Sequence, residues 1–147
     1  MVTKDDLLGS WALVSAVQVF DDGQREDEFG PDPVGFLCYS TGGIVSATLG
    51  SSHRPRLAAE DPQGATPDEY ASAAALFIAY AGPFTVDPEN GTVVHHVSVS
   101  LYPNWENEDQ VRTVTLQGDL LNIAASPRTA QDGRTFHSEL RWSRVRL

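Results

Sequence analysis

The sequence has little of several features that would place it in a familiar class. Cys38 is the only cysteine among the 147 residues, so an internal disulfide is excluded. No apolar run approaches the roughly 20 residues that a membrane-spanning helix needs. The first residues, MVTKDDLLGSW, contain no apolar signal stretch. We therefore expect a cytoplasmic protein.

Positive charge is scarce as well. The chain has 10 Lys and Arg residues against 20 Asp and Glu residues, which gives a formal net charge of −10. Such a field repels phosphate backbones and anionic lipid surfaces. Nucleic acid and membranes are therefore not expected as partners, and the acidic excess is typical of a solvated coat that keeps a small protein soluble.

Motifs that indicate cofactor or metal chemistry are missing too. The chain contains neither the Gly-rich loops that hold nucleotides nor the Gly-x-Ser-x-Gly and His-Glu-x-x-His patterns of hydrolases. Its 4 histidines are scattered, and nothing in their spacing makes them converge on a metal ion. We expect no cofactor and no metal.

What the chain does have is a series of short β-rich segments separated by glycine and proline. Tight hairpins are predicted at the glycine pair of STGG, at Asn90-Gly91 and at Gly118-Asp119. The pattern indicates eight strands, joined mostly by hairpins, within a single domain that spans residues 1–147. A chain of this length, with 41% apolar residues, is long enough to bury a real core.

One segment differs from the rest and predicts a helix over residues 67–81. Thr66 can cap it, Pro67 suits the first helical position, Glu69 completes a capping box, and Gly82-Pro83 would end it. One face of this helix would carry Tyr70, Ala73, Ala74, Phe77, Tyr80 and Ala81. We therefore expect a mainly β fold, an eight-stranded antiparallel barrel with the helix packed at its open end. Such a barrel has room for its own side chains or for one small ligand.

Several blocks of the sequence resemble the lipocalin-like domain family of bacteria and fungi. They occur in order between about residue 7 and residue 145, as LLGSWALVSA, GPDPVGFLCYSTGGIVSATL, ATPDEYASAAALFIAYAGPFTVD, GTVVHHVSVSLYPNW and DQVRTVTLQGDLL. Gly9-Ser10-Trp11 is similar to the Gly-x-Trp signature of the first lipocalin strand. The resemblance implies a calycin-type β-barrel, and similar barrels of natural-product pathways act as cofactor-free cyclases, dehydratases or isomerases on apolar intermediates. The missing signal stretch and disulfide set this chain apart from secreted lipocalins.

Strand alternation assigns a direction to each of two adjacent histidines. His95 and His96 must point to opposite faces, so they cannot bind one metal ion together. The residues that share the parity of His95 are apolar: Val93, Val97, Val99 and Leu101. This face should therefore lie inside the barrel, with His96 outside. Arg112 alternates in the same way with apolar neighbours, Val114 and Leu116, and is also expected to point inward.

The two inward polar residues are open to two interpretations each. Arg112 either lies near the barrel mouth, where it reaches water or pairs with Glu106, Glu108 or Asp109, or it clamps an oxyanion or carbonyl inside the cavity. His95 is either a hydrogen-bonded interior residue without chemistry or a proton-transferring group, since an unperturbed histidine has a pKa near ~6.5. Consecutive antiparallel strands would bring the two residues close together.

Three further expectations concern the ends of the barrel and the faces of one strand. Trp11 should plug the closed end beneath a C-terminal arginine such as Arg144. The long connection of residues 50–64 and the helix after it should stand at the open end and control access to the interior. Alternation does not decide which of Cys38 and Tyr39 faces inward.

The leading functional hypothesis is a cavity that binds an apolar small molecule with carbonyl or hydroxyl groups, such as a polyketide- or terpenoid-like metabolite. It favours cofactor-free acid/base catalysis of a cyclisation, dehydration or isomerisation, with His95 as general acid or base, Arg112 stabilising negative charge and Tyr39 as an auxiliary donor. The residues expected to contact the ligand are Phe36, His53, Phe77, Tyr80, Trp105, Ser138 and Trp142. The alternatives are a non-catalytic carrier that uses the same cavity, and a structural protein whose barrel is filled by its own side chains.

Overall fold

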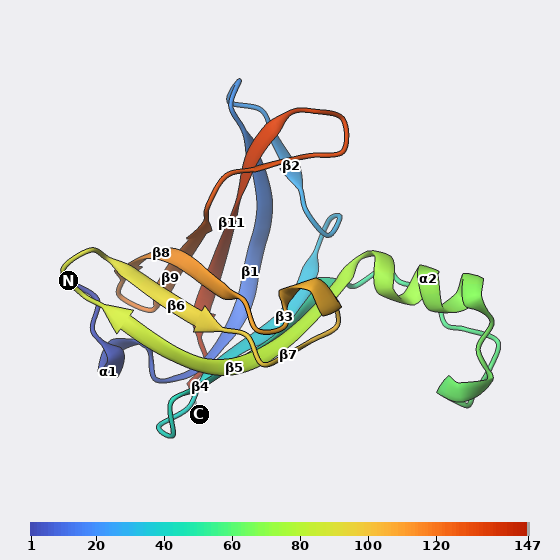
Figure 1. Cartoon of the computed structure of the whole chain (residues 1–147), viewed down its shortest axis with the longest axis horizontal. Coiled ribbons are helices and arrows are strands. Elements are labelled where there is room, and N and C mark those ends of the chain that lie inside the picture. Colours follow the sequence, from blue (N-terminus) through green and yellow to red (C-terminus); the bar gives the residue numbers. More distant parts are fainter. Residues whose placement is uncertain (147) are drawn as a thin grey trace.

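A closed ring of antiparallel strands forms the body of the molecule. The computed structural model describes residues 1–146. Eight long strands pair in the order β1, β3, β4, β5, β6, β8, β9 and β11, and β11 pairs again with β1 to close the sheet (Figure 1). The predicted eight-stranded antiparallel barrel is therefore confirmed. These strands are β1 (Gly9–Phe20), β3 (Pro33–Tyr39), β4 (Ile44–Ser51), β5 (Phe77–Asp87), β6 (Thr92–His96), β8 (Asp109–Gln117), β9 (Leu120–Ala125) and β11 (Thr135–Arg144).

The hairpins form where the glycine signals predict them. Gln117 pairs with Leu120 across the two-residue turn Gly118-Asp119, and Gly118 has a φ of 60°. Only glycine adopts this left-handed conformation without steric cost, which is why the turn fixes the register of β8 and β9. Gly91, with a φ of 65°, adopts the same left-handed conformation in the turn between β5 and β6.

Short elements extend the ring at its two ends. β2 (Arg25–Asp27) pairs with β1, and β10 (Arg128–Thr129) pairs with β11. Figure 1 shows that these pairs rise above the rest of the barrel as an upstanding arm. The remaining short elements are α1 (Lys4–Leu7), β7 (Val99–Ser100) and two 3-10 turns, η1 (Pro62–Gly64) and η2 (Pro103–Trp105).

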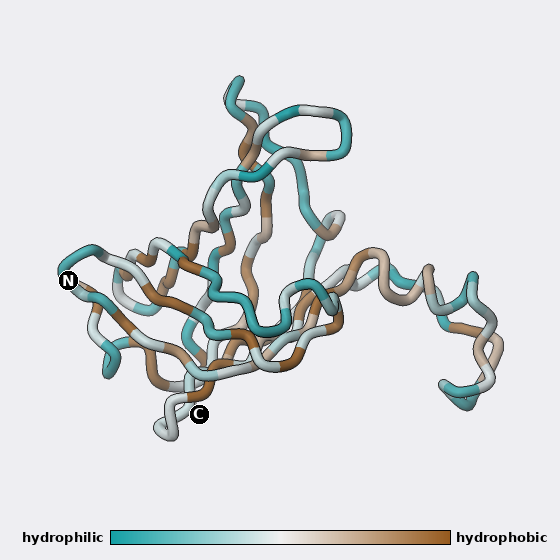
Figure 2. The backbone as a smooth tube through the Cα atoms, viewed as in Figure 1, coloured by the Kyte–Doolittle hydropathy of each residue, from teal (hydrophilic) through white to brown (hydrophobic). Residues whose placement is uncertain are grey.

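The core fills the closed end of the barrel beneath α1. Trp11 is 0% exposed and donates from its indole nitrogen to the carbonyl oxygen of Leu7 at 2.9 Å. The guanidinium of Arg144 lies 4.1 Å from the centre of the Trp11 ring and donates to the carbonyl oxygens of Leu8 and Asp6. The predicted plug is therefore confirmed. Figure 2 shows hydrophobic residues along the strands and hydrophilic ones at the hairpin tips, as a buried interior requires.

The helix starts as predicted but ends early. α2 (Pro67–Ala75) has the Thr66–Glu69 capping box, yet the predicted end at residue 81 is wrong because the chain becomes β5 at Phe77. Aromatic and β-branched residues follow Ala75, and pairing with β4 overrides their helical periodicity. α2 stands at one end of the barrel, but none of its residues is buried, and Figure 1 shows it projecting outward.

A break after β6 overturns part of the predicted inner face. Phe84 faces His95, whereas Ala81 faces Val99, so one extra residue is inserted between β6 and β7. A one-residue shift exchanges the two faces of a strand. Val99 is consequently 58% exposed and Leu101 46% exposed, and their predicted inward placement is wrong.

Candidate functional site: the barrel cavity

A cavity opens into the barrel at the end opposite the Trp11 plug. The cavity has a volume of about 70 Å³ for the centres of water-sized molecules, within about 590 Å³ of empty space that includes the mouth open to solvent. Most wall residues are apolar or aromatic, among them Leu37, Leu49, Trp105, Ile123 and Trp142. The polar wall residues are Glu28, Tyr80, His95, Arg112, Arg128 and Ser138. The side chains therefore leave some space inside the barrel, which favours a ligand cavity over a barrel filled by its own side chains.

His95 lies inside the cavity wall, held between two tyrosines. The hydroxyl oxygen of Tyr39 on β3 is 2.8 Å from Nε2 of His95, and that of Tyr80 on β5 is 2.9 Å from Nδ1. His95 is 1% exposed, so its predicted inward direction is confirmed. Burial, helped by the positive charge of Arg112, lowers the pKa of His95 to about 3. The imidazole is therefore neutral at physiological pH, with both nitrogens engaged.

Tyr39 and Cys38, which alternation left unassigned, are now placed. Tyr39 is 1% exposed and Cys38 is half-buried on the opposite face. The ring of Tyr39 also packs edge-on against Phe84, with ring centres 4.8 Å apart. Burial raises the pKa of the Tyr39 hydroxyl well above its usual value, so it acts only as a neutral hydrogen-bonding group.

Arg112 reaches the cavity from β8, as alternation predicts. Its guanidinium donates to the side-chain oxygen of Gln110 and to the carbonyl oxygen of Val111. Its positive charge also acts on the Tyr80 hydroxyl, where it opposes the rise in pKa that burial causes. Within residues 1–146 no carboxylate lies at ion-pair distance from Arg112. Burial lowers the pKa of Arg112, but a guanidinium stays charged in proteins.

Two of the three expected acidic partners of Arg112, Asp109 and Glu106, are engaged elsewhere, and Glu108, which the structure also describes, forms no ion pair with it. Asp109 contacts Nδ1 of His96 at 2.7 Å on the outer surface, where the Thr85 hydroxyl holds the other ring nitrogen. Glu106 accepts a hydrogen bond from the backbone nitrogen of Ser100. The predicted outward direction of His96 is confirmed by these contacts. Arg112 therefore faces the cavity as a cation with neutral partners.

A second polar group, which the sequence did not reveal, lies towards the mouth. One carboxylate oxygen of Glu28 accepts from Ser138 at 2.9 Å and from Arg128 at 3.0 Å. Burial raises the pKa of Glu28 despite these two donors. The residues come from the loop after β2, from β10 and from β11, and the contacts join positions 100 or more apart in sequence. Only the inward parity of Ser138 was visible in the sequence.

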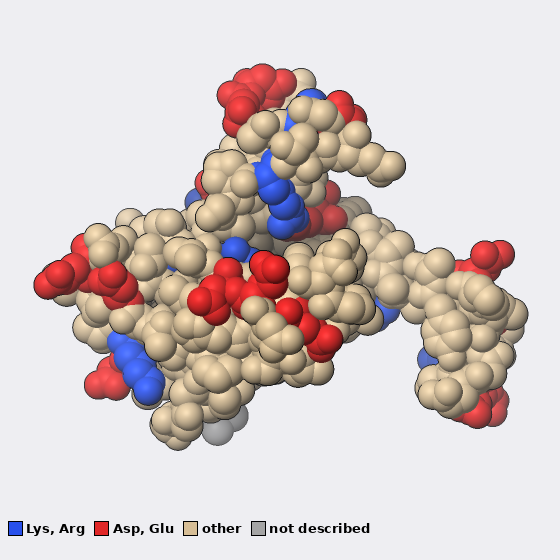
Figure 3. Space-filling view, in the orientation of Figure 1, with Lys and Arg blue, Asp and Glu red and all other residues tan. Residues whose placement is uncertain are grey.

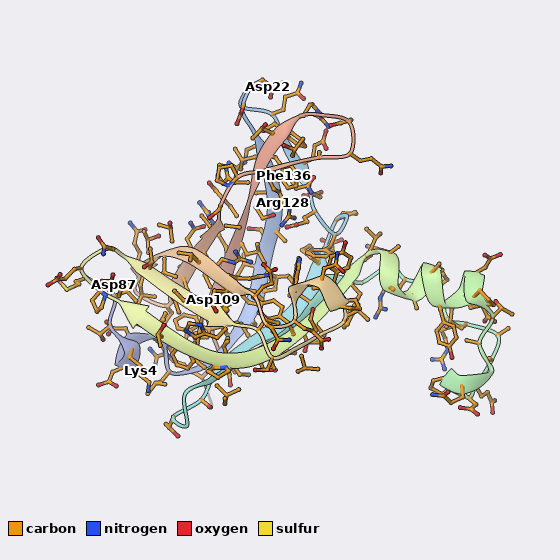
Figure 4. All side chains as sticks on the ribbon, viewed as in Figure 1. Lys4, Asp22, Asp87, Asp109, Arg128 and Phe136 are labelled. Carbon is orange, nitrogen blue, oxygen red and sulfur yellow. The ribbon has the colours of Figure 1, made fainter. Side chains whose placement is uncertain are left out.

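Arg128 of this group can be followed in the figures. Figure 4 labels Arg128 beside β11, in the upstanding arm. Figure 3 shows basic side chains in the hollow between this arm and the front of the barrel, with acidic side chains nearby. Arg128 and Glu28 therefore bring charge to the rim of an otherwise apolar opening.

Aromatic side chains surround the mouth. Trp105 on η2 packs edge-on against Tyr80, with ring centres 6.0 Å apart, and against Tyr102 at 5.8 Å. Phe77 at the start of β5 lines a neighbouring surface pocket that shares Phe29 and Trp105 with the cavity. Such an aromatic rim suits an aromatic or apolar ligand.

The other expected ligand contacts divide between the wall and the outside. Ser138 and Trp142 line the cavity, and within the described residues the indole N–H of Trp142 is the buried side-chain donor that lacks a partner. Phe36 is 60% exposed on the outer face, because Leu37 takes the inward direction on β3. His53 is exposed and lies 3.8 Å from Asp32, away from the cavity. The structure therefore does not bring Phe36 and His53 to the cavity.

Residues 1–146 contain neither a metal-binding cluster nor a membrane-spanning helix. No group of three or more His, Cys, Asp or Glu side chains within residues 1–146 is arranged to hold a metal ion. None of the helices in the same part of the chain is long and apolar enough to cross a membrane.

Comparison with known proteins agrees with the barrel and its cavity. A family model described as the lipocalin-like domain matches residues 8–145. The chain therefore belongs to the lipocalin-like domain family. A curated relative from Aspergillus oryzae, the 4'-hydroxy-3'-methoxypropiophenone carrier protein ppsC, is 32% identical over 107 residues, which cover 69% of this chain and 96% of that protein. No solved structure matches the chain.

Proposed function

We propose that this protein is a non-catalytic carrier that holds an aryl ketone, or a similar aromatic metabolite with carbonyl and hydroxyl groups, inside its barrel. The observation that carries the proposal is the cavity itself, an apolar space with a few polar groups at fixed positions. The carrier name of the Aspergillus relative supports the same class of function. Apolar wall residues would bury the ring, and Arg112 and Tyr80 would orient its oxygen atoms.

The state of His95 favours a carrier over the acid/base catalyst expected from the sequence. A general base works best when its pKa lies near the working pH. The pKa of His95 is about 3, and both ring nitrogens are held by tyrosine hydroxyls. The residue therefore has little capacity to accept a proton from a ligand.

A titration with 4'-hydroxy-3'-methoxypropiophenone, followed by tryptophan fluorescence, tests the carrier. Trp105 and Trp142 line the cavity, so a bound ring should change their emission. We expect saturation at one ligand per chain and recovery of the ligand unchanged. Ala47→Leu should weaken binding about tenfold or more, because the larger side chain occupies space in the cavity and the bound ligand would overpack it, at about 1–3 kcal/mol. Ser46→Leu, on the exposed face next to it, is the matched control. Absence of saturable binding contradicts the proposal.

One observation supports catalysis as a second candidate function. Glu28 is a largely buried carboxyl group at the cavity with a raised pKa, which suits a proton-transferring group better than His95 does. The test is deuterium uptake from heavy water at the carbon next to the ligand carbonyl. With a non-catalytic carrier, the rate of deuterium uptake should equal the rate in buffer alone. A catalyst gives a faster rate, which Glu28→Gln should reduce by about 10²- to 10⁴-fold.

A further inference from the structure

The hydrogen-bond direction through His95 follows from what each tyrosine can reach. A neutral imidazole donates from one nitrogen and accepts at the other. Tyr39 is 1% exposed, does not line the cavity, and has His95 as its hydrogen-bond partner. Its hydroxyl proton must therefore go to Nε2 of His95, since the opposite direction leaves a buried donor without an acceptor.

This direction leaves the hydroxyl proton of Tyr80 available. If Nε2 of His95 accepts, its Nδ1–H donates to the oxygen of Tyr80. The cationic Arg112 lines the same cavity wall as Tyr80. The Tyr80 oxygen thus accepts from His95 in a wall that carries a positive charge, and its own proton is free for a further acceptor. Because hydrogen bonds in a chain polarise one another, Tyr80 becomes a strong donor at the cavity wall.

The charges around the Tyr80 hydroxyl favour a negatively charged ligand. Arg112 has neutral partners, and the carboxylate nearest to it in the cavity wall, that of Glu28, is paired with Arg128 at 3.0 Å. His95 faces the same region as a neutral group, and Tyr39 behind it is neutral as well. The wall therefore holds two guanidinium groups against one carboxylate. An oxyanion beside Arg112 would balance the charge and accept the Tyr80 proton.

Resting on the proposed function, we infer that the cavity binds its ligand through an ionised phenol or enol oxygen, held between the Tyr80 hydroxyl and the Arg112 guanidinium. The ligand's own proton passes to solvent on binding. Two donors that converge on one oxygen suit a phenolate or enolate, whereas a carboxylate brings two oxygens that both need donors. Tyr80 and Arg112 are thus the residues that determine specificity for an acidic hydroxyl.

The test uses 4-hydroxyacetophenone at a pH where the free phenol is neutral. Its phenolate absorbs at longer wavelength, so a difference spectrum reports the state of the bound ligand. We expect the phenolate band to appear on saturation. Arg112→Gln should remove the band and weaken binding about 10- to 100-fold, as for a lost hydrogen bond to a charged group. Tyr80→Phe should weaken binding about tenfold. Arg141→Gln, on the exposed outer face of β11, should change neither.

Two analogues keep the inference separate from the proposed function. The methyl ether, 4-methoxyacetophenone, should bind at least about tenfold more weakly than the phenol. The carboxylate analogue, 4-acetylbenzoate, should also bind more weakly. If the phenol binds in its neutral form, or the carboxylate binds best, the carrier stands and the inference is overturned. If neither the phenol nor the ether binds, both are overturned. Should Arg112→Gln fail to fold, the Tyr80→Phe variant and the methyl ether still test whether the ligand binds through an ionised oxygen.

Discussion

His95 connects three strands by hydrogen bonds inside the barrel. It joins Tyr39 on β3 to Tyr80 on β5 from its own position on β6, with both contacts shorter than 3.0 Å. Alternation placed this residue inside, but it could not reveal that two tyrosines occupy its two nitrogens. The consequence is a residue that orders the cavity wall and remains neutral while doing so.

Replacing His95 should therefore cost stability. His95→Ala removes a buried ring and leaves two tyrosine hydroxyls unpaired, so we expect a loss of about 2–4 kcal/mol in the free energy of unfolding. His96→Ala, on the outer surface, should cost less than about 1 kcal/mol. Urea unfolding of both variants measures the difference. Equal losses contradict the placement.

The low pKa of His95 also predicts how stability changes with pH. Between pH 6.5 and about 3 the unfolded chain holds a proton on this residue that the folded protein does not. Stability should therefore fall as pH drops through that window. His95→Gln, which cannot titrate, should flatten this part of the profile. If the free energy of unfolding changes with pH in the same way in the parent and in His95→Gln, this prediction is contradicted.

Glu28 should act in the opposite direction. Burial raises its pKa above 4.5, so the folded protein holds this proton more tightly than the unfolded chain. Its contribution to stability is lost as pH rises from 4.5 through the raised value. We expect Glu28→Gln to gain stability relative to the parent as pH increases over that range. Chemical unfolding at a series of pH values checks the sign.

At the scale of elements, local signals were reliable for turns and for the helix start. Glycine positions marked the β8–β9 and β5–β6 turns, and Thr66 with Glu69 marked the start of α2. The end of α2 and the extra residue before β7 were missed, because both depend on which strand lies alongside. The pairing of β5 with β4 and with β7 determines the end of α2 and the position of the extra residue. A local sequence pattern does not show which strands pair.

The exposed helix makes a prediction about local opening. α2 has no buried residue, so its amides should exchange far faster than those of β1 and β11. Thr66→Ala removes a cap worth about 1 kcal/mol and should speed exchange in residues 67–75 without changing global stability. Ligand should slow exchange there if this segment controls access, since Ala74 of α2 lines a pocket that borders the cavity. Unchanged exchange on binding argues against a gate.

At the scale of the whole molecule, closure of the ring makes the site. Pairing of β1 with β11 brings the last strand beside the first, so that Ser138 and Trp142 face the same space as Tyr80 and Arg112. Strand parity predicted several of these wall residues. Glu28 and Arg128 could not be predicted, because they lie in short extensions whose positions depend on the closed barrel.

The most direct test of the carrier is a crystal structure with an aryl ketone bound. The proposal predicts one ligand inside the barrel, its ring beside Trp105 and one of its oxygens within hydrogen-bond distance of the Tyr80 hydroxyl. The ligand should show no covalent change. A ligand bound only on the outer surface, or an interior without ligand at concentrations that saturate the protein in solution, would contradict the account.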